Sequence, residues 1–200
     1  MGKQEINNRI KLFKADLKKS NFSSERIVSK YITFGNPYIF NNDPDKFYEL
    51  KEGIANYYNI RPSCVKMAGS AKLGFSLKQE KLWEHITLDS DIDAVVISNY
   101  LFDDYWKKIL SYYNPNQISM LTPEQRNDYT QLRKYLFKGW LRLDLLAPGI
   151  PGIKDHFDLT KKLYNVYDNR KVAIGFYRSE DFFEYYHTLN INNIRKTYDK

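Results

Sequence analysis

The sequence has very little cysteine and no long apolar run, and each shortage excludes a class of protein. Cys64 is the single cysteine in 200 residues, which excludes an internal disulfide and zinc sites built from CxxC pairs. No apolar stretch approaches the roughly 20 residues of a membrane-spanning helix. The first residues, MGKQEINNRIKLFK, lack the apolar core of a signal peptide. We therefore expect a cytoplasmic protein without a membrane partner.

Positive charge is in excess, but it is not concentrated in one segment. The chain has 31 Lys and Arg against 24 Asp and Glu, a formal net charge of +7. No block of consecutive Lys or Arg marks a basic arm. The excess favours polyanionic partners such as nucleoside triphosphates or RNA, although many proteins of this charge bind neither.

The three histidines follow no metal-binding pattern. His85, His156 and His187 lie far apart, and no HxxxH spacing is present. We expect each of them to have a structural role in the core or at the surface.

Hydrophobic periodicity predicts helices that alternate with short strands, and hence an α/β (α+β) fold with a small mixed sheet. We expect one domain over residues 1–200, with N-terminal helices in 1–60, a core in 61–150, and a strand and helices in 151–200. Residues 75–90 suit a hairpin or loop with its tip in solvent. The expected helices are 4–19, one after Ser23-Ser24, 43–58, 102–113, one from 122, 158–164 and one after Ser179, and the expected strands are 65–68, 91–97, 140–146 and 172–177.

Two aspartates lie two residues apart at the start of an apolar run. In Asp91-Ile92-Asp93-Ala94-Val95, a strand would place both carboxylates on one face. Like charges this close raise each other's pKa unless a cation lies between them. Divalent ions prefer carboxylate oxygens. The stretch therefore indicates a metal-dependent site that handles phosphate.

Two further features accompany this pair. Gly69-Ser70 follows the short apolar run 65–68, as expected of a turn at the end of a strand. Strict alternation in WLRLDLL predicts a later strand, 140–146, that carries Asp144 on the same face as Arg142.

In this order the three features resemble the nucleotidyltransferase superfamily typified by DNA polymerase β. That family has a Gly-Ser turn after a strand, an Asp-hydrophobic-Asp strand and a third carboxylate on a neighbouring strand. The resemblance covers about residues 60–150. The segment between Ser70 and Asp91 is longer here than is usual, as in members with a hairpin at this point.

The resemblance implies an Mg²⁺-dependent transfer of a nucleotide from an NTP to a hydroxyl on RNA, a protein, a small molecule or another nucleotide. Asp91 and Asp93 would hold two Mg²⁺ or Mn²⁺ ions, and Asp144 would complete the ion at the acceptor. Gly69 and Ser70 would receive the triphosphate, with Lys72 as a further phosphate contact. Such charge neutralisation and positioning is what phosphoryl transfer requires.

Other readings of the same residues stay open. An Asp-x-Asp pair also occurs on ordinary surface strands, and Asp144 could form a structural salt bridge with Arg142. Small members of the superfamily also occur in toxin–antitoxin and phage-defence systems. The alternative function is therefore a catalytically silent partner that binds a nucleotide or RNA within such a complex.

Overall fold

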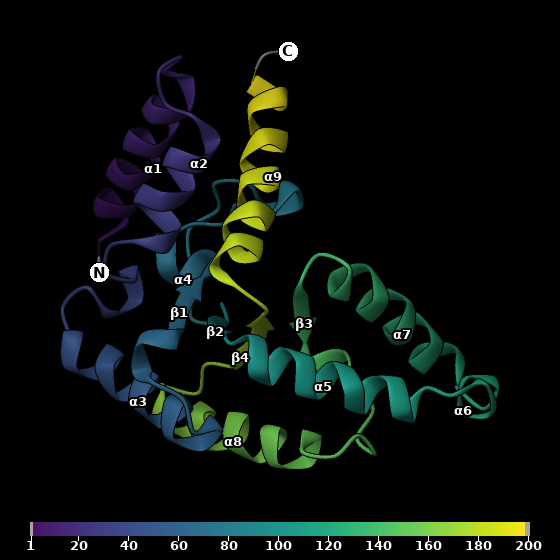
Figure 1. The fold of residues 1–200 in the computed structure, drawn as a ribbon. Coiled ribbons are helices and arrows are strands. Elements are labelled where there is room, and N and C mark those ends of the chain that lie inside the picture. Colours follow the sequence, from purple (N-terminus) through teal and green to yellow (C-terminus); the bar gives the residue numbers. More distant parts are fainter. Residues whose placement is uncertain (1, 199–200) are drawn as a thin grey trace. The chain divides into compact units, whose positions relative to one another are not determined.

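The computed structural model describes residues 2–198 and shows an α+β fold with a four-stranded mixed sheet (Figure 1). The strand order is β1-β2-β4-β3. The expected fold class is confirmed. The chain divides into two compact units, the first made of residues up to 94 and from 184 on, and the second of residues 95–183. The bounds differ from the three expected segments, and a single domain stays a prediction.

The first unit contains the N-terminal helices, strand β1, the start of β2 and most of the last helix. The second unit begins within β2 and ends in the first turn of α9. In the first unit lie α1 (Lys3–Lys18), α2 (Ser24–Val28), a π-helical turn (Ser29–Thr33), α3 (Pro44–Tyr58), β1 (Val65–Ala68), α4 (Gly69–Leu73), the start of β2 (Ile92–Ile97) and most of α9 (Glu180–Tyr198). In the second lie the rest of β2, α5 (Asn99–Tyr112), α6 (Pro115–Ser119), α7 (Pro123–Leu136), β3 (Trp140–Arg142), α8 (Ile153–Val166) and β4 (Val172–Tyr177).

Local capping signals in the sequence set several helix starts. The Asp43 carboxylate accepts the amide N–H of Lys46 at 2.9 Å, and Pro44 occupies the first helical position of α3. Thr122 and Gln125 form a reciprocal capping box, with bonds of 3.3 and 3.0 Å, at the start of α7. These boundaries follow from neighbouring residues alone and confirm the prediction.

An aromatic cluster joins α1 to the loop between α4 and β2. Phe13 is fully buried, and its ring centroid lies 4.6 Å from that of Tyr31, 5.5 Å from Phe75 and 5.8 Å from Trp83. An isolated antiparallel bridge pairs Phe75 with His85. The loop 75–90 therefore has a packed base, whereas residues 78–81 at its tip are exposed as expected.

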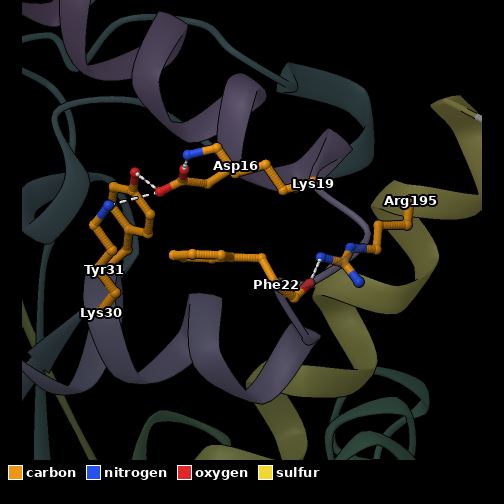
Figure 2. Close-up of polar contacts among 6 residues, drawn as sticks. All are labelled: Asp16, Lys19, Phe22, Lys30, Tyr31 and Arg195. Carbon is orange, nitrogen blue, oxygen red and sulfur yellow. Dashed lines mark hydrogen bonds and ion pairs between the residues drawn. The ribbon is translucent and has the colours of Figure 1, made fainter.

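A buried carboxylate holds the N-terminal helices of the first unit together (Figure 2). Asp16 on α1 is 3% exposed and accepts hydrogen bonds from Lys19 at 2.6 Å, Lys30 at 2.6 Å and Tyr31 at 2.8 Å. Burial by itself raises the pKa of Asp16, but these three hydrogen bonds outweigh it and hold the pKa well below its usual range. Because Lys30 and Tyr31 lie on the π-helical turn, the carboxylate ties that segment to α1.

The last helix joins the same region of the first unit. The Arg195 guanidinium of α9 donates a hydrogen bond to the backbone carbonyl of Phe22 (Figure 2). Ile191 and Ile194, one turn apart on α9, are buried. The link joins residues 173 positions apart and has no signal in the sequence.

In the second unit, β3 and β4 pair antiparallel through a glycine. Trp140 faces Tyr177, Leu141 faces Phe176 and Arg142 faces Gly175. The Trp140 and Tyr177 rings stack at 5.4 Å, and a Cβ on Gly175 would come within 2.7 Å of the Trp140 indole nitrogen. Gly175 thus leaves the space that the indole occupies.

The predicted strand 140–146 is wrong beyond Arg142. Residues Leu143–Leu145 form a 3-10 turn, closed by a 3.2 Å bond from the amide of Leu146 to the carbonyl of Leu143. Alternation alone cannot detect this, because the local bond replaces a ladder bond to a partner strand. Moreover, β4 lies between β2 and β3 in the sheet, so β3 is not the neighbour of the Asp-x-Asp strand that the resemblance implies.

Among the helices of residues 2–198, none is both long enough and apolar enough to cross a bilayer.

Asp16→Asn should lower the free energy of unfolding by about 1–3 kcal/mol, because two lysines would lose their carboxylate partner. The expected loss of stability is smaller than for a fully buried ion pair, because the side chains of Lys19 and Lys30 are about half exposed. Urea unfolding at pH 7 measures the change. Glu80→Gln, an exposed acid-to-amide change in the same unit, is the control and should stay within about 0.5 kcal/mol of the parent. Equal stability of the two variants would contradict the assigned role of Asp16.

Candidate functional site

The Gly-Ser turn lies where strand β1 passes into helix α4. Ala68 is extended, with φ −131°, and Gly69 has a φ of +68°, which residues with a Cβ rarely adopt. Gly69 is exposed and Ser70 is half-buried. The first amides of a helix have no partner within it, so those of α4 point out of the turn at its start.

The Asp93 carboxylate lies directly against Gly69 in the first unit. A Cβ built on Gly69 would come within 2.0 Å of Asp93 Oδ2 and 3.0 Å of its Cγ. β1 and β2 are hydrogen-bonded neighbours, and the proximity of Gly69 to Asp93 places the end of β1 beside the start of β2. Glycine is therefore required at position 69 by two independent constraints, its backbone angle and the adjacent carboxylate.

The two aspartates of the Asp-x-Asp pair lie at the start of β2 as expected. Asp91 directly precedes the strand and Asp93 is its second residue, with the fully buried Ile92 between them. Both aspartates are half-buried. Their spacing of two places both side chains on one face of the extended backbone, opposite the core residue Ile92.

Lys72 is less accessible than a phosphate contact is expected to be. It lies on α4, is 5% exposed, and its ammonium donates a hydrogen bond to the backbone carbonyl of Gly35. Burial, followed by repulsion from Arg9, Lys51 and Lys66, lowers the pKa of Lys72 to about 8. The amine thus packs against the polypeptide, and a role in phosphate binding stays a prediction.

Asp144 belongs to the second unit and forms an ion pair there. Its carboxylate accepts two bonds from the Arg142 guanidinium, at 2.6 Å from Nη2 and 3.2 Å from Nε. The bidentate pair is partly exposed, with 43% of the Asp144 side chain accessible. The structural salt bridge left open by the sequence is therefore present.

The structure adds His156 to the surroundings of Asp144. His156 lies on α8 and is 2% exposed, and burial lowers its pKa to about 4 although the nearby Asp144 charge opposes the shift. A structural role in the core was among those expected for His156, but the predicted helix began only at 158 and left this residue outside it. Ile153, His156 and Leu163 recur at helical spacing on the buried face of α8, and that spacing could have shown it.

The candidate residues thus fall into two sets. Gly69, Ser70, Asp91 and Asp93 lie in the first unit, and Asp144 lies in the second. Across residues 2–198, no three His, Cys, Asp or Glu side chains gather into a group that could hold a metal ion. A pair of carboxylates is nevertheless a sufficient protein contribution for Mg²⁺, which often binds one or two carboxylates and completes its shell with water and substrate phosphates.

Comparison of the chain with protein-family models, curated proteins and solved structures gives no match. The resemblance to the nucleotidyltransferase superfamily therefore depends only on the residues described above. Its functional content is a proposal.

Gly69→Ala should lower the free energy of unfolding by about 2–3 kcal/mol, from left-handed backbone strain and the clash with Asp93. In an Asp93→Ala background the same change should cost about 1 kcal/mol less, because the carboxylate is gone. Urea unfolding of the four proteins in this double-mutant cycle measures the coupling. A coupling near zero would mean that the two residues do not meet as described.

Acid should destabilise the protein as pH falls from about 6.5 to 4. Burial lowers the pKa of His156 and of His187 from 6.5 to about 4. An unfolded histidine therefore binds a proton before a folded one does, so this stability is complete above pH 6.5 and declines toward pH 4. Each histidine can account for up to about 3 kcal/mol, at 1.36 kcal/mol per pKa unit.

Urea unfolding at pH 7 and pH 4.5 tests this dependence in the parent, in His156→Gln and in His85→Gln. His156→Gln should lose less stability between the two pH values than the parent does. His85, which is partly exposed and bonds to Asn7, supplies the matched control. An unchanged loss in His156→Gln would rule out the titration of His156 as a cause.

Proposed function

We propose that the protein is a metal-dependent nucleotidyltransferase that moves an NMP from an NTP to a hydroxyl acceptor. The observation that supports this most strongly is the contact between Gly69 and the Asp93 carboxylate. Gly69 belongs to the Gly-Ser turn and Asp93 to the Asp-x-Asp strand, and the two residues are 24 positions apart in the sequence. Their contact brings both features together at a site where Gly69 is exposed and Asp93 is half-buried.

This arrangement suits a triphosphate for a physical reason. Helix starts favour anions because their first amides are unpaired and the helix dipole is positive there. Gly69 has no side chain, so a phosphate can approach the backbone of the turn closely. Ser70 supplies a hydroxyl one residue later. Without neutralisation, the Asp93 carboxylate beside this turn would repel the same phosphate.

Asp91 and Asp93 are the residues that would hold Mg²⁺ or Mn²⁺. Bound there, such ions would neutralise phosphate charge and polarise the oxygens of the transferring group. The protein would contribute two fixed carboxylates on one strand and the backbone of the turn. For Asp144 to take part in the same chemistry, it would have to leave its ion pair with Arg142.

A second candidate function is a catalytically silent partner that binds a nucleotide or RNA, for instance in a toxin–antitoxin or phage-defence complex. The engagement of Asp144 by Arg142 favours it, because both oxygens of the third carboxylate already accept hydrogen bonds from the guanidinium. Both candidates imply a cytoplasmic protein that meets NTPs and an RNA or protein partner.

The test of the enzyme is to incubate the purified chain with each α-labelled NTP, Mg²⁺ or Mn²⁺, and total RNA or cell lysate as acceptor. Asp93→Ala should reduce label transfer by at least about 100-fold, since a ligand of the metals is lost. The variant should remain folded, because removal of one of two like charges relieves repulsion.

Asp89→Ala is the matched control, because Asp89 is an exposed carboxylate just before the Asp-x-Asp pair. It should transfer label at the parent rate. If no NTP gives transfer but the parent still binds NTP with metal, the silent partner is the better reading. Transfer that persists in Asp93→Ala would exclude this site.

A further inference from the structure

One face of α7 in the second unit carries cations and no carboxylate. Arg126, Thr130 and Arg133 recur at spacings of four and three residues, and Lys134 lies beside them, so all four share one side of the helix. Each of the four is exposed. The helix rises about 1.5 Å per residue, so the face extends over roughly 15 Å from Arg126 to the end of α7, which lies ten residues later.

The acidic residues of α7 point elsewhere. Glu124 and Asp128 are each two residues from Arg126, which at 100° per residue places them about 160° away from it around the helix axis. Leu132 is buried and marks the side that packs on the core. The charges are therefore segregated, with the cations together on the solvent side.

A fully exposed aromatic ring ends this face. Phe137 follows the last residue of α7 in a helical conformation, with φ −61° and ψ −26°, four residues after Arg133. It is 92% exposed, although burying a phenylalanine side chain is worth about 1.5–3 kcal/mol. Lys138 is exposed directly after it. An exposed ring between cations does not stabilise the isolated protein, because no apolar surface is buried. The same ring and cations could bind a ligand that has flat rings and negative charge.

The rings of two neighbouring tyrosines contact two of these cations. The Arg133 guanidinium lies 5.8 Å from the ring centroid of Tyr129, and the Lys138 ammonium lies 5.7 Å from that of Tyr135. Such cation–π contacts limit the freedom of long side chains while leaving their charged ends in solvent. The surface is thus partly ordered before a ligand arrives.

We propose that this α7 surface, formed by Arg126, Arg133, Lys134, Phe137 and Lys138, binds single-stranded RNA. Cations that follow a phosphate backbone, with an aromatic ring on which a base stacks, are the elements of single-strand recognition. A duplex would leave Phe137 without a base face, because paired bases are stacked on each other. Unpaired bases are common in RNA loops and ends.

The proposal does not depend on the nucleotidyltransferase assignment. All its residues lie in the second unit, and it uses none of Gly69, Asp91 or Asp93. If that assignment is correct, the α7 surface would hold an RNA acceptor. The binding test below includes neither NTP nor metal, so its failure and the failure of the transfer test are separate results.

Fluorescence anisotropy with a labelled, unstructured single-stranded RNA and the full chain measures the affinity over a range of salt concentrations. Phe137→Ala should weaken binding about 5- to 150-fold, the effect of one lost stacking contact, with the salt slope unchanged. Arg133→Glu/Lys134→Glu should weaken binding further and lower the magnitude of the slope by about 1.4, at roughly 0.7 for each phosphate contact in a single strand.

Lys161→Glu/Lys162→Glu is the matched control, because both lysines are exposed on α8 in the same unit and the net charge changes equally. It should bind RNA nearly as the parent does. Equal weakening by the two double variants would overturn the proposal in favour of general charge attraction. An unchanged affinity in Phe137→Ala, or duplex bound as tightly as single strand, would overturn it as well. Circular dichroism should show that the variants are folded.

Discussion

The close approach of Gly69 to the Asp93 carboxylate is the constraint on which the candidate site depends. It fixes the identity of residue 69 twice, through a φ of +68° and through the 2.0 Å separation that a Cβ would have from Oδ2. It also brings a helix start, which attracts anions, beside a carboxylate, which repels them. In the proposed function, a cation bound there would neutralise both the carboxylate and the phosphate.

Two carboxylates outside the candidate site pair with cations of their own unit. The buried Asp16 binds two ammonium groups and a phenol, and the partly exposed Asp144 binds a guanidinium. His156 instead stays neutral, because burial lowers its pKa to about 4. The candidate site and the α7 surface have a different composition. Two carboxylates share one face of a strand at the candidate site, and an exposed phenylalanine ring lies between cations at the α7 surface.

The sequence predicted the parts of the site whose signals are local. The Asp-x-Asp strand, the strand before Gly69 and the caps at Asp43 and Thr122 all depend on neighbouring residues, and the structure confirms them. It failed at Asp144, where alternation continued beyond the point at which the chain leaves the sheet. Periodicity reports which residues are apolar, but a strand also needs a partner, and that partner is chosen by the tertiary structure.

The sequence by itself thus determined the fold class and most element boundaries, because propensity, capping and periodicity act over a few residues. Only the tertiary structure decided that Asp93 touches Gly69 and that Lys72 is buried. It also left Phe137 in solvent beside a basic face. These facts depend on which segments pack together, and distant contacts leave no regular spacing in the chain.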